Sequence, residues 1–595
     1  MRRSQMLTTY GPGALVDLLD HAVIIGGLDA WRFGPQVEVV PEARLRDRVA
    51  ARLKDLGREL RLEDAFRLPP AGEDDEPHPG RGVPARLFPT WFVCQRCRAL
   101  VRAGSLQERG SRFVHDCTDR GAACVPVRFV QACESGHIDD VNWIGVAHRG
   151  KGCEAPALAL DEGASGDFSE VRVLCRACGA SRSLTDLKVP EMKPACRGRR
   201  PWLGRDSEEA CERKASLIVR TASSAYFSQI DSALAIPDVD HAIDDAVAAQ
   251  WKVLKAATEA TLPAFRTIED VQAAIGDFSD AEVLAAVARR AEGRKPERLP
   301  IRVAEYRQFI AAEDEVPGEI APPDVQFFAR RARMDAIDGI ERVVLVHALR
   351  EVRCQVGFTR LGFPCPSLSG EPGSMVRSAP LGLNTDWLPA IEVRGEGIFF
   401  ALDPDRLDEW EKRPAVQARS AELAQAFEAE FADWEDPPAF FGVRAYLLHS
   451  LAHLLITAVS LECGYSASAI RERIYCSAPD APGAPDAPKP ARPMAGVLLA
   501  TATPGTEGTL GGLVAQGRRL GQHLEAARRQ AMLCSNDPVC ASHQANGPDE
   551  RRLEGAACHG CLFISESSCE WFNHSLDRAL VVPVLGQDPK LAFFG

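Results

Sequence analysis

The sequence predicts a mixed α+β fold of several domains, with a cysteine-rich module near the N-terminus, a helical middle and a C-terminal α/β domain. Three observations lead to this prediction. A chain of 595 residues is too long for one hydrophobic core. Its 19 cysteines fall mainly into two clusters, one near each end, and several form C-x-x-C pairs. Alanine-rich stretches with helical spacing lie between the clusters, beside short apolar runs that are typical of buried strands.

Shifts in composition divide the chain into five expected domains. These are an N-terminal α/β segment (1–88), a cysteine-rich module (89–236), a helical region (237–345), a mixed α/β region (346–440) and a C-terminal domain (441–595).

In the first segment, the apolar run Ala22–Gly27 is expected to be a buried strand. A helix is expected over Glu42–Leu62, where leucine and valine recur near helical spacing. Pro69–Pro84 is rich in proline, glycine and acidic residues, which predicts a loop.

Apolar periodicity predicts the remaining elements. Helices are expected over Ala242–Ala257, Ile268–Gly293, Ala421–Phe431, Val443–Leu461 and Val514–Leu533, and strands over Val343–His347, Ile398–Leu402 and Gly496–Ala502. The Ala/Pro/Asp tract Ala478–Pro493 is expected to be extended. The glycine run Gly505–Gly512 is expected to make a tight turn from strand to helix.

The net charge of −13 argues against a protein that coats nucleic acid by bulk charge. Residues 91–220 differ from the rest, because they hold 21 Lys/Arg and 17 Asp/Glu. The densest basic run there, Arg197, Arg199 and Arg200, is either a phosphate contact or a solvated loop. The sequence has no secretory signal pattern and no uninterrupted apolar run of about 18 residues. These features predict a cytoplasmic protein with no membrane partner.

The N-terminal cysteine cluster predicts zinc. A C-x-x-C loop places two sulfurs on one side of a tight turn, and a tetrahedral zinc ion needs four such ligands. Two closed sites are expected, although the second half of each is loosely spaced. One comprises Cys94, Cys97, Cys117 and Cys124, and the other comprises Cys175, Cys178, Cys196 and Cys211. Buried free cysteines or a redox pair are the alternatives, but no clear βαβ context supports a redox motif.

A third site is conceivable between these two. Its ligands would be Cys133, His137, His148 and Cys153, and the alternative is a locally hydrogen-bonded turn beside Trp143. A hydrolytic use of His137 with the adjacent Asp139 and Asp140 is disfavoured, because no nucleophile accompanies them.

The C-terminal cluster predicts a further zinc site with one spare cysteine. The candidates are Cys534, Cys540, Cys558, Cys561 and Cys569, of which the Cys558–Cys561 pair is the firmest. His449 and His453 are spaced as in zinc proteases, but serine follows the first histidine, so the H-E-x-x-H motif is absent. Their leucine-rich surroundings favour hydrogen-bonded core histidines.

No catalytic motif accompanies these clusters in the sequence. It has no G-x-x-x-x-G-K-[ST] loop, no G-x-S-x-G elbow and no dinucleotide fingerprint in a strand–helix setting. A large chain with several zinc clusters and no such constellation is expected to be a scaffold or recognition subunit and not an enzyme.

Several motifs resemble known families. The C-terminal part resembles the zinc-binding domain of MrfA-type DNA helicases. The matching pieces are His449–His453 (HSLAH), Gly496–Leu513, Cys558–Leu562 (CHGCL) and Asn573–Arg578 (NHSLDR). Across most of its length the chain resembles the DrmB family of the DISARM anti-phage system. That match rests on Thr9–Ala14 (TYGPGA), Arg128–Asp140 (RFVQACESGHIDD), Arg220–Phe227 (RTASSAYF) and Arg350–Leu361 (REVRCQVGFTRL).

The resemblance implies a function. Such a protein is expected to be a non-catalytic partner of DrmA, a helicase-like ATPase, and to help recognise or load foreign DNA through that complex. It also implies that four cysteines of the C-terminal domain hold one zinc ion. The alternatives from other classes are a metal-dependent nuclease or hydrolase and a thiol redox sensor.

Overall fold

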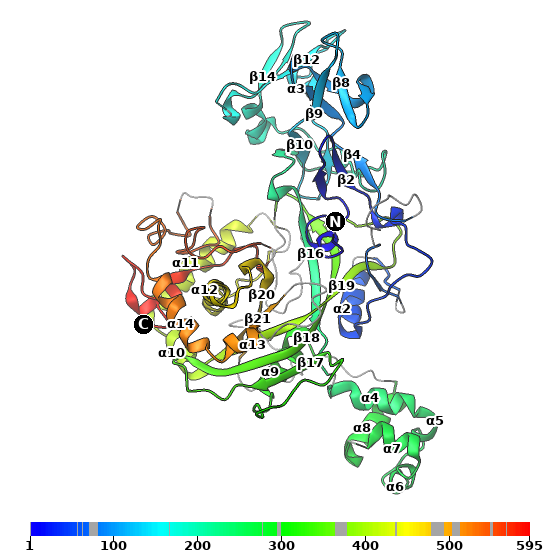
Figure 1. Cartoon of the computed structure of the whole chain (residues 1–595), viewed down its shortest axis with the longest axis vertical. Coiled ribbons are helices and arrows are strands. Elements are labelled where there is room, and N and C mark those ends of the chain that lie inside the picture. The colour runs from blue at the N-terminus through cyan, green and yellow to red at the C-terminus, as the bar shows by residue number, and fades with distance from the viewer. Residues whose placement is uncertain are drawn as a thin grey trace.

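Two long antiparallel strands organise the chain in the computed structural model (Figure 1). They are β18 (Ile340–Thr359) and β19 (Leu388–Leu402), paired from Ile340 opposite Leu402 to Cys354 opposite Ala390. Both are rich in β-branched and aromatic residues, which suit an extended strand buried on both faces. The structure describes residues 2–55, 57–61, 64–70, 81–165, 167–237, 239–276, 278–293, 299–362, 378–432, 434, 437–477, 493–501, 512–547, 551–566 and 568–595.

The other strands of the central seven-stranded sheet add to this pair. The order is β16-β18-β19-β21-β20, and in addition β17 pairs with β18 and β3 with β19. All pairs are antiparallel except β3 with β19. The added strands are β3 (Phe66–Arg67), β16 (Phe227–Leu234), β17 (Phe327–Arg331), β20 (Ile470–Cys476) and β21 (Ala495–Thr501).

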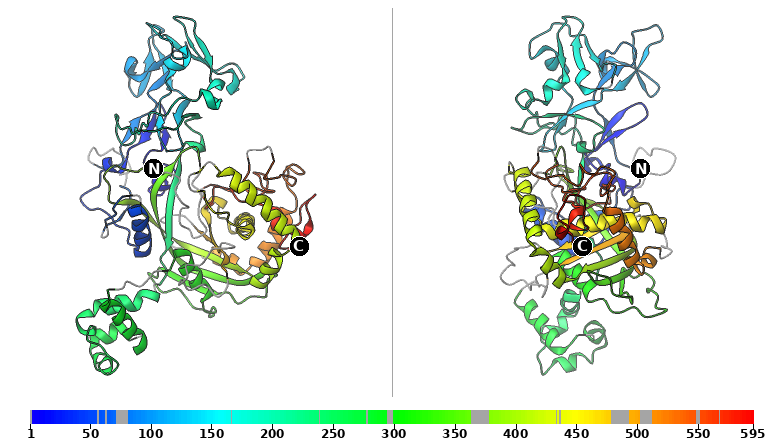
Figure 2. Two further views of the ribbon diagram at one scale, coloured as in Figure 1. Left: turned by 180° about the vertical axis from the view of Figure 1, so that it is seen from behind. Right: turned by 90° about the vertical axis from the view of Figure 1, so that its left-hand side faces the viewer.

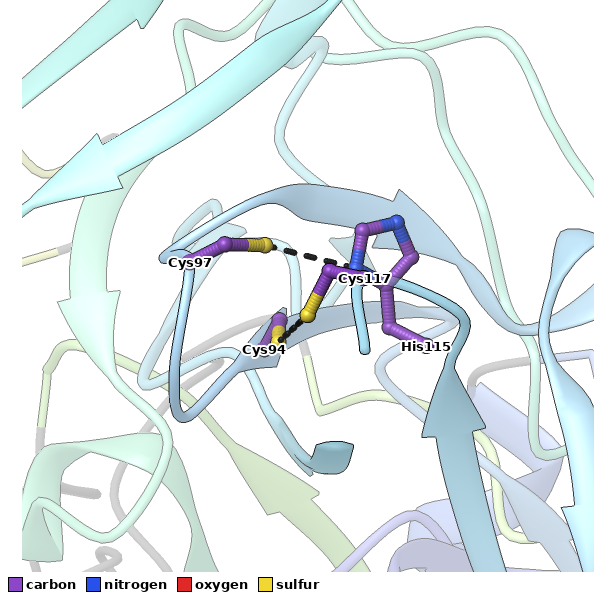
Figure 3. A group of neighbouring side chains, drawn as sticks. All are labelled: Cys94, Cys97, His115 and Cys117. Atoms are coloured by element: carbon purple, nitrogen blue, oxygen red, sulfur yellow. Dashed lines mark hydrogen bonds between the residues drawn. The ribbon is translucent and has the colours of Figure 1, made fainter. Parts of the chain in front are cut away.

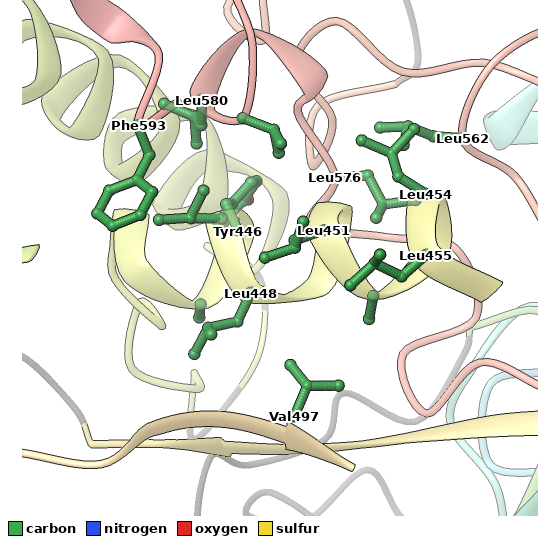
Figure 4. Packing of buried hydrophobic residues seen from close by; sticks show 14 of the residues in the cluster. Tyr446, Leu448, Leu451, Leu454, Leu455, Val497, Leu562, Leu576, Leu580 and Phe593 are labelled. Carbon is green, nitrogen blue, oxygen red and sulfur yellow. The ribbon is translucent and has the colours of Figure 1, made fainter. Parts of the chain in front are cut away.

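The largest core surrounds helix α12 (Val443–Cys463). The helix is apolar on all sides, and a helix of that kind must be enclosed by protein. Figure 4 shows it between Val497 of β21 on one side and Leu576, Leu580 and Phe593 of the C-terminal segment on the other. The surrounding helices are α10 (Pro404–Glu411), α11 (Pro414–Glu430), α13 (Gly512–Gly517) and α14 (Leu520–Ala531).

Among the described residues, α12 is the one helix long and apolar enough to cross a membrane by length and composition. Its apolar window is 72% buried inside the protein, and it packs in the centre of the largest core. The helix ends at Gly464, which has a left-handed φ of +73° that favours glycine.

A second core joins the N-terminal segment to the far half of the β18–β19 pair. Helix α2 buries Leu45, Val49 and Leu53 in the same core as Val352 and Val356 of β18. The elements of this segment are α1 (Gln5–Thr8), β1 (Leu15–Asp17), β2 (Ala22–Ile25), α2 (Ala43–Asp55) and β4 (Ala85–Leu87).

The fully buried Arg360, just beyond β18, connects three remote segments of the chain. Its guanidinium donates to the carbonyl oxygens of Gly13 at 2.6 Å, Gly136 at 2.9 Å and Ala225. Burial lowers the pKa of Arg360 to about 9, so the side chain stays cationic near neutral pH.

The cysteine-rich residues form an arm that projects from one end of the central sheet (Figures 1 and 2). Its strands make a five-stranded sheet, β6-β5-β9-β8-β7, and two three-stranded sheets, β12-β13-β14 and β11-β10-β15. Its own core is small and centres on Trp143 and Leu160. The elements are β5 (Trp91–Cys94), β6 (Leu100–Arg102), β7 (Gln107–Arg109), β8 (Arg112–His115), β9 (Ala122–Pro126), β10 (Phe129–Ala132), β11 (Ile138–Asp139), α3 (Trp143–His148), β12 (Leu158–Asp161), β13 (Arg172–Cys175), β14 (Ser181–Ser183) and β15 (Ser216–Val219).

A small helical unit lies at the opposite end of the molecule from the arm, as all three views show (Figures 1 and 2). Ser279 and Glu282 form a capping box that begins its last helix. The unit comprises α4 (Val239–Ala249), α5 (Trp251–Leu254), α6 (Leu262–Phe265), α7 (Glu269–Ile275) and α8 (Asp280–Ala291). The next helix, α9 (Ile301–Ile310), returns to the central sheet, where Phe309 stacks on Phe399 at a centroid distance of 4.4 Å.

The structure confirms the mixed α+β fold, with N-terminal cysteine clusters and a helical middle. The observed helices and strands differ from the expected ones in where some of them begin and end. The helix expected over Glu42–Leu62 is α2, which ends at Asp55, and the two expected helices of the middle are each divided in two. The short strands expected in the mixed region are parts of β18 and β19.

Two expected domain boundaries fall inside the central sheet. The boundary at 345/346 lies within β18, and the boundary at 440/441 separates β19 from its neighbour β21. Both boundaries therefore separate segments that pair with each other in the central sheet. Most of the loop 69–84, of the tract 478–493 and of the glycine run 505–512 lies outside the described residues.

The leucines of α12 provide a test of this core. We expect Leu451→Ala to lower the free energy of unfolding by about 2–5 kcal/mol, because removal of the fully buried side chain leaves a cavity in the core around α12. Leu461→Ala on the same helix is the matched control. That side chain is 71% exposed, and the change should stay within about 0.5 kcal/mol. Urea denaturation measures both, and equal losses would contradict this packing.

Candidate metal centres

Four groups of cysteine and histidine side chains each bring four ligand atoms within 4.8 Å of one another. In three of the groups, sulfur atoms lie 3.4–4.0 Å apart, and all the cysteines of the four groups are free thiols. Two thiolates on one tetrahedral zinc lie about 3.8 Å apart, from a bond length of about 2.3 Å. The groups are therefore spaced as ligand sets for zinc. They are Cys94–Cys97–His115–Cys117, Cys133–His137–Cys196–Cys211, His148–Cys153–Cys175–Cys178 and Cys534–Cys540–Cys558–Cys561.

The first group joins the turn after β5 to the end of β8 (Figure 3). Cys94 Sγ lies 3.6 Å from Cys117 Sγ, and Cys97 Sγ lies 3.3 Å from Nδ1 of His115. The turn is closed by Arg98, whose N–H donates to the Cys94 carbonyl at 3.0 Å from a left-handed φ of +60°. This geometry points both thiols of the C-x-x-C pair toward His115, the last residue of β8, and Cys117, which follows it.

His115 stands in this group where the sequence suggested Cys124. Cys124 lies on β9 directly opposite Cys94, and its thiol is directed at the Ala122 carbonyl at 3.8 Å. The pairing of β8 with β9 places His115 and not Cys124 in the group, because it brings the end of β8 over the C-x-x-C turn. The sequence argument counted only cysteines and therefore missed the histidine two residues before Cys117.

The second group lies where the arm meets the central sheet. Nδ1 of His137 lies 3.3 Å from Cys133 Sγ and 3.6 Å from Cys196 Sγ, while Nε2 lies 2.8 Å from the Glu209 carboxylate. A carboxylate that accepts from the outer nitrogen fixes the ring and directs the other lone pair at the metal. Hydrogen bonding from Cys196 lowers the pKa of Cys133 to about 4, which favours the thiolate. Cys211 completes the group, 4.0 Å from Cys133.

The third group lies farther out on the arm, between α3 and the β12–β13–β14 sheet. The Cys175–Cys178 turn repeats the geometry of the first group, because Gly179 has a φ of +74° and donates to the Cys175 carbonyl at 2.9 Å. Nδ1 of His148 donates to the Ile144 carbonyl at 2.8 Å. Its Nε2 is buried without a hydrogen bond and is free to bind a metal.

These two groups rearrange the ligand sets expected from the sequence. Cys196 and Cys211 do not join the Cys175–Cys178 pair, and the conceivable third set is divided between the two groups. In sequence, all four ligands of the third group lie between His137 and Cys196 of the second group. The reason is that β12–β14 are inserted between β10 and β15, and the pairing of β10 with β15 brings the two ends of the insertion together.

The fourth group contains four of the five candidate C-terminal cysteines. Cys534 lies 3.4 Å from Cys558, and Cys561 lies 3.7 Å from Cys540 and 3.8 Å from Cys558. Hydrogen bonding from Cys561 lowers the pKa of Cys540 to about 5, again favouring a thiolate. Cys569 is not part of this group and lies against His449, with 3.1 Å between Cys569 Sγ and Nε2 of the histidine.

The basic run of the arm is engaged by carboxylates. Arg197 pairs with Asp139 at 2.5 Å, Arg199 with Glu208 at 3.1 Å and Arg200 with Glu209 at 2.6 Å. Because Glu209 also contacts His137, Arg200 helps to hold the second group together. Arg197 is the most exposed of the three, with 55% of its side chain accessible.

The ligand set of the first group can be tested directly. We expect His115→Ala to remove one zinc ion per chain, because three sulfurs remain without a fourth ligand, and Cys124→Ala to leave the zinc content unchanged. Inductively coupled plasma mass spectrometry of the full chain measures both. Loss of one zinc ion in Cys124→Ala, with no loss in His115→Ala, would instead support Cys94, Cys97, Cys117 and Cys124 as the ligands.

Comparisons with known proteins agree with this geometry. Residues 2–227 match a family described as a domain of unknown function (DUF8724), and residues 451–562 match the family described as the MrfA Zn-binding domain. The second match includes the whole fourth group. Together with the clusters, it identifies zinc as the cofactor of this chain.

One relative extends over most of the chain. The DISARM protein DrmB of Bacillus paralicheniformis (strain ATCC 9945a / NCIMB 11709 / CD-2) is 30% identical over 546 residues, which is 85% of this chain and 90% of the relative. A crystal structure of the DUF1998 helicase MrfA bound to DNA matches 36% of this chain and 22% of its own, at 13% identity. Its TM-score of 0.17 is too low to establish a shared fold. On the first of these matches, the chain belongs to the family of the DISARM protein DrmB and has a DISARM-related role in defence.

Proposed function

We propose that this chain is a non-catalytic subunit that works beside a helicase-like ATPase, and that it is a zinc-stiffened scaffold helping to recognise or load foreign DNA. The observation that carries the proposal is the completeness of the four Cys/His groups. Each offers four protein ligands, as structural zinc sites do, whereas catalytic zinc keeps one position for water or substrate. A redox role is less well supported, because each C-x-x-C pair shares its group with two further ligands.

The residues that could serve a hydrolase are engaged elsewhere. Asp140 accepts from the Thr90 N–H at 3.0 Å and from the Thr90 hydroxyl at 2.5 Å. Asp139 pairs with Arg197, and both ring nitrogens of His137 face groups of the second metal centre. A metal-dependent hydrolase would need these carboxylates free to hold an open metal position.

The overall shape supports a scaffold role. The arm and the helical unit extend from opposite ends of the central sheet, so each presents its surface away from the main cores (Figure 2). Metal ligation stiffens the arm, which has little core of its own. We assign the arm to DNA, because residues 91–220 are basic within an acidic protein, and the helical unit to the ATPase partner.

Phage protection distinguishes a scaffold from a hydrolase. We expect Asp139→Ala to keep its zinc content, its binding to the helicase subunit and its protection of cells. The carboxylate pairs with Arg197 and accepts from the Asp140 N–H, and it belongs to no ligand group among the described residues. Glu208→Ala, which removes the neighbouring carboxylate that pairs with Arg199, is the control. Plaque assays together with a helicase pull-down provide the readouts. Loss of protection by Asp139→Ala alone, with zinc and partner retained, would favour the hydrolase.

The basic run can be tested through the salt dependence of DNA binding. Arg197 is 55% exposed, and its more buried partner Asp139 also accepts from the Asp140 N–H at 2.8 Å, so the carboxylate keeps a partner when Arg197 turns to a phosphate. We expect Arg197→Ala to reduce the slope of log K against log salt by about one in the complex with the helicase. Arg289→Ala in the remote helical unit removes the same charge and should leave the slope unchanged. Equal slopes for all three proteins would exclude a phosphate contact at Arg197.

A further inference from the structure

A fifth group of potential ligands lies in the interior of the C-terminal unit. His449 and His453 come from α12, Glu472 from β20 and Cys569 from the segment after the fourth cysteine group. Their ligand atoms all lie within 4.8 Å of one another, and no side chain in the group is more than 3% exposed. The matched zinc-binding family spans residues 451–562, so it includes His453 and Glu472 but neither His449 nor Cys569.

The hydrogen bonds of the two histidines determine which ring nitrogen carries the proton. Nδ1 of His449 lies 3.3 Å from the Ser575 carbonyl, and Nδ1 of His453 lies 2.8 Å from the Leu562 carbonyl. A carbonyl oxygen can only accept, so Nδ1 must be the donor in both rings. In a neutral imidazole this leaves a bare lone pair on each Nε2. Both lone pairs point into the group.

Nε2 of His449 can accept from the Cys569 thiol at 3.1 Å, but Nε2 of His453 faces no donor. Nε2 of His449 lies 3.0 Å from Glu472 Oε1, and Nε2 of His453 lies 3.3 Å from Glu472 Oε2. A carboxylate also only accepts, and neither His453 Nε2 nor Glu472 Oε2 makes a hydrogen bond. Buried polar atoms left in this state cost about 1–3 kcal/mol each.

Protonating the histidines does not resolve the conflict well. The two rings are 4.4 Å apart, so two imidazolium ions would repel each other inside the core. A single imidazolium at His453 would still leave the lone pair of His449 Nε2 only 3.0 Å from Glu472 Oε1. A cation among the four atoms removes the conflict for all of them at once.

Cys569 is arranged as a thiolate ligand. Its sulfur accepts the backbone N–H groups of Trp571 at 3.3 Å and Asn573 at 3.2 Å, which stabilise a negative sulfur. With one thiolate, one carboxylate and two neutral imidazoles, the group has a charge of about −2, which a divalent ion would neutralise in this buried position.

We propose that His449, His453, Glu472 and Cys569 bind a fifth divalent transition-metal ion, zinc in this chain, at a structural site. Adjacent ligands of a tetrahedral zinc lie roughly 3.3–3.8 Å apart, so the contacts of 3.0–3.3 Å in this group need to open by only a few tenths of an ångström. Four protein ligands leave no open position, which assigns the ion a structural role.

The site would connect three parts of the fold. It would join the core helix α12 to strand β20 of the central sheet, and both to the segment that follows the Cys558–Cys561 pair. Glu472 and Cys569 also line a cavity of about 350 Å³, together with Glu570, Trp571 and Phe572. The cavity offers the ion a route to an otherwise enclosed site, and the ion in turn would hold this wall of the cavity in place.

Counting metal ions by native mass spectrometry tests the proposal on the full chain. We expect five zinc ions in the unchanged protein and one fewer in Cys569→Ala. Cys476→Ala is the matched control, because it also removes a buried thiol, on the strand that carries Glu472, and Cys476 belongs to no group among the described residues. The control should keep all five ions. An unchanged count in folded Cys569→Ala would overturn the proposal.

A second measurement uses the unchanged protein, so it holds even if the variant does not fold. After exchange with ¹¹³Cd²⁺, each site gives one cadmium resonance whose position reports the number of sulfur ligands. Three of the Cys/His groups have three possible thiolates and the fourth has four, whereas the fifth group has a single thiolate. One additional resonance in the single-sulfur region is expected. Its absence, in a protein that shows the four sulfur-rich resonances, would overturn the site without affecting the scaffold function.

Discussion

The pairing of β18 with β19 is the constraint on which the other parts of the structure depend. One end of this ladder lies in the core around α12, and the other end lies in the core of the N-terminal segment. Every backbone N–H and C=O buried along it must find a partner, and the neighbouring strands provide these partners. Because β16 and β17 line one edge and β21 and β3 the other, segments from the whole chain are held in one sheet.

The Cys/His groups of the arm would add metal cross-links to its small hydrophobic core. The strands of the arm are two to five residues long, too short to hold a stable sheet without further cross-links. The nested arrangement of the second and third groups fixes both the base and the outer part of the arm. The same Cys-x-x-Cys turn serves the first and third groups, with a left-handed residue directly after the second cysteine in each. Bound metal would stiffen the arm as an extension of the sheet, which suits the recognition role proposed for it.

Several charged groups inside the protein are matched by partners from distant segments. Arg473 of β20 pairs with Glu305 of α9 at 2.7 Å and with Glu351 of β18 at 3.4 Å. Arg360 is satisfied by three backbone carbonyls. His453 and Glu472 differ in that two unpartnered buried atoms, Nε2 of the histidine and Oε2 of the carboxylate, face each other at 3.3 Å. The proposed cation would give both atoms a partner.

The sequence by itself determined the local features. C-x-x-C spacing indicated zinc, apolar periodicity located α2 and α12, and the motifs around Arg128–Asp140 and Cys558–Leu562 indicated the family. These follow from interactions between residues close along the chain. Only the tertiary structure decided which ligands belong together. His115 takes the place of Cys124 because of the β8–β9 pairing. Cys196 and Cys211 group with Cys133 because β10 pairs with β15 across the inserted strands. Cys569 groups with His449 and His453 and not with the other four C-terminal cysteines. A metal ion selects ligands by their distance in space, and pairing between remote strands sets those distances.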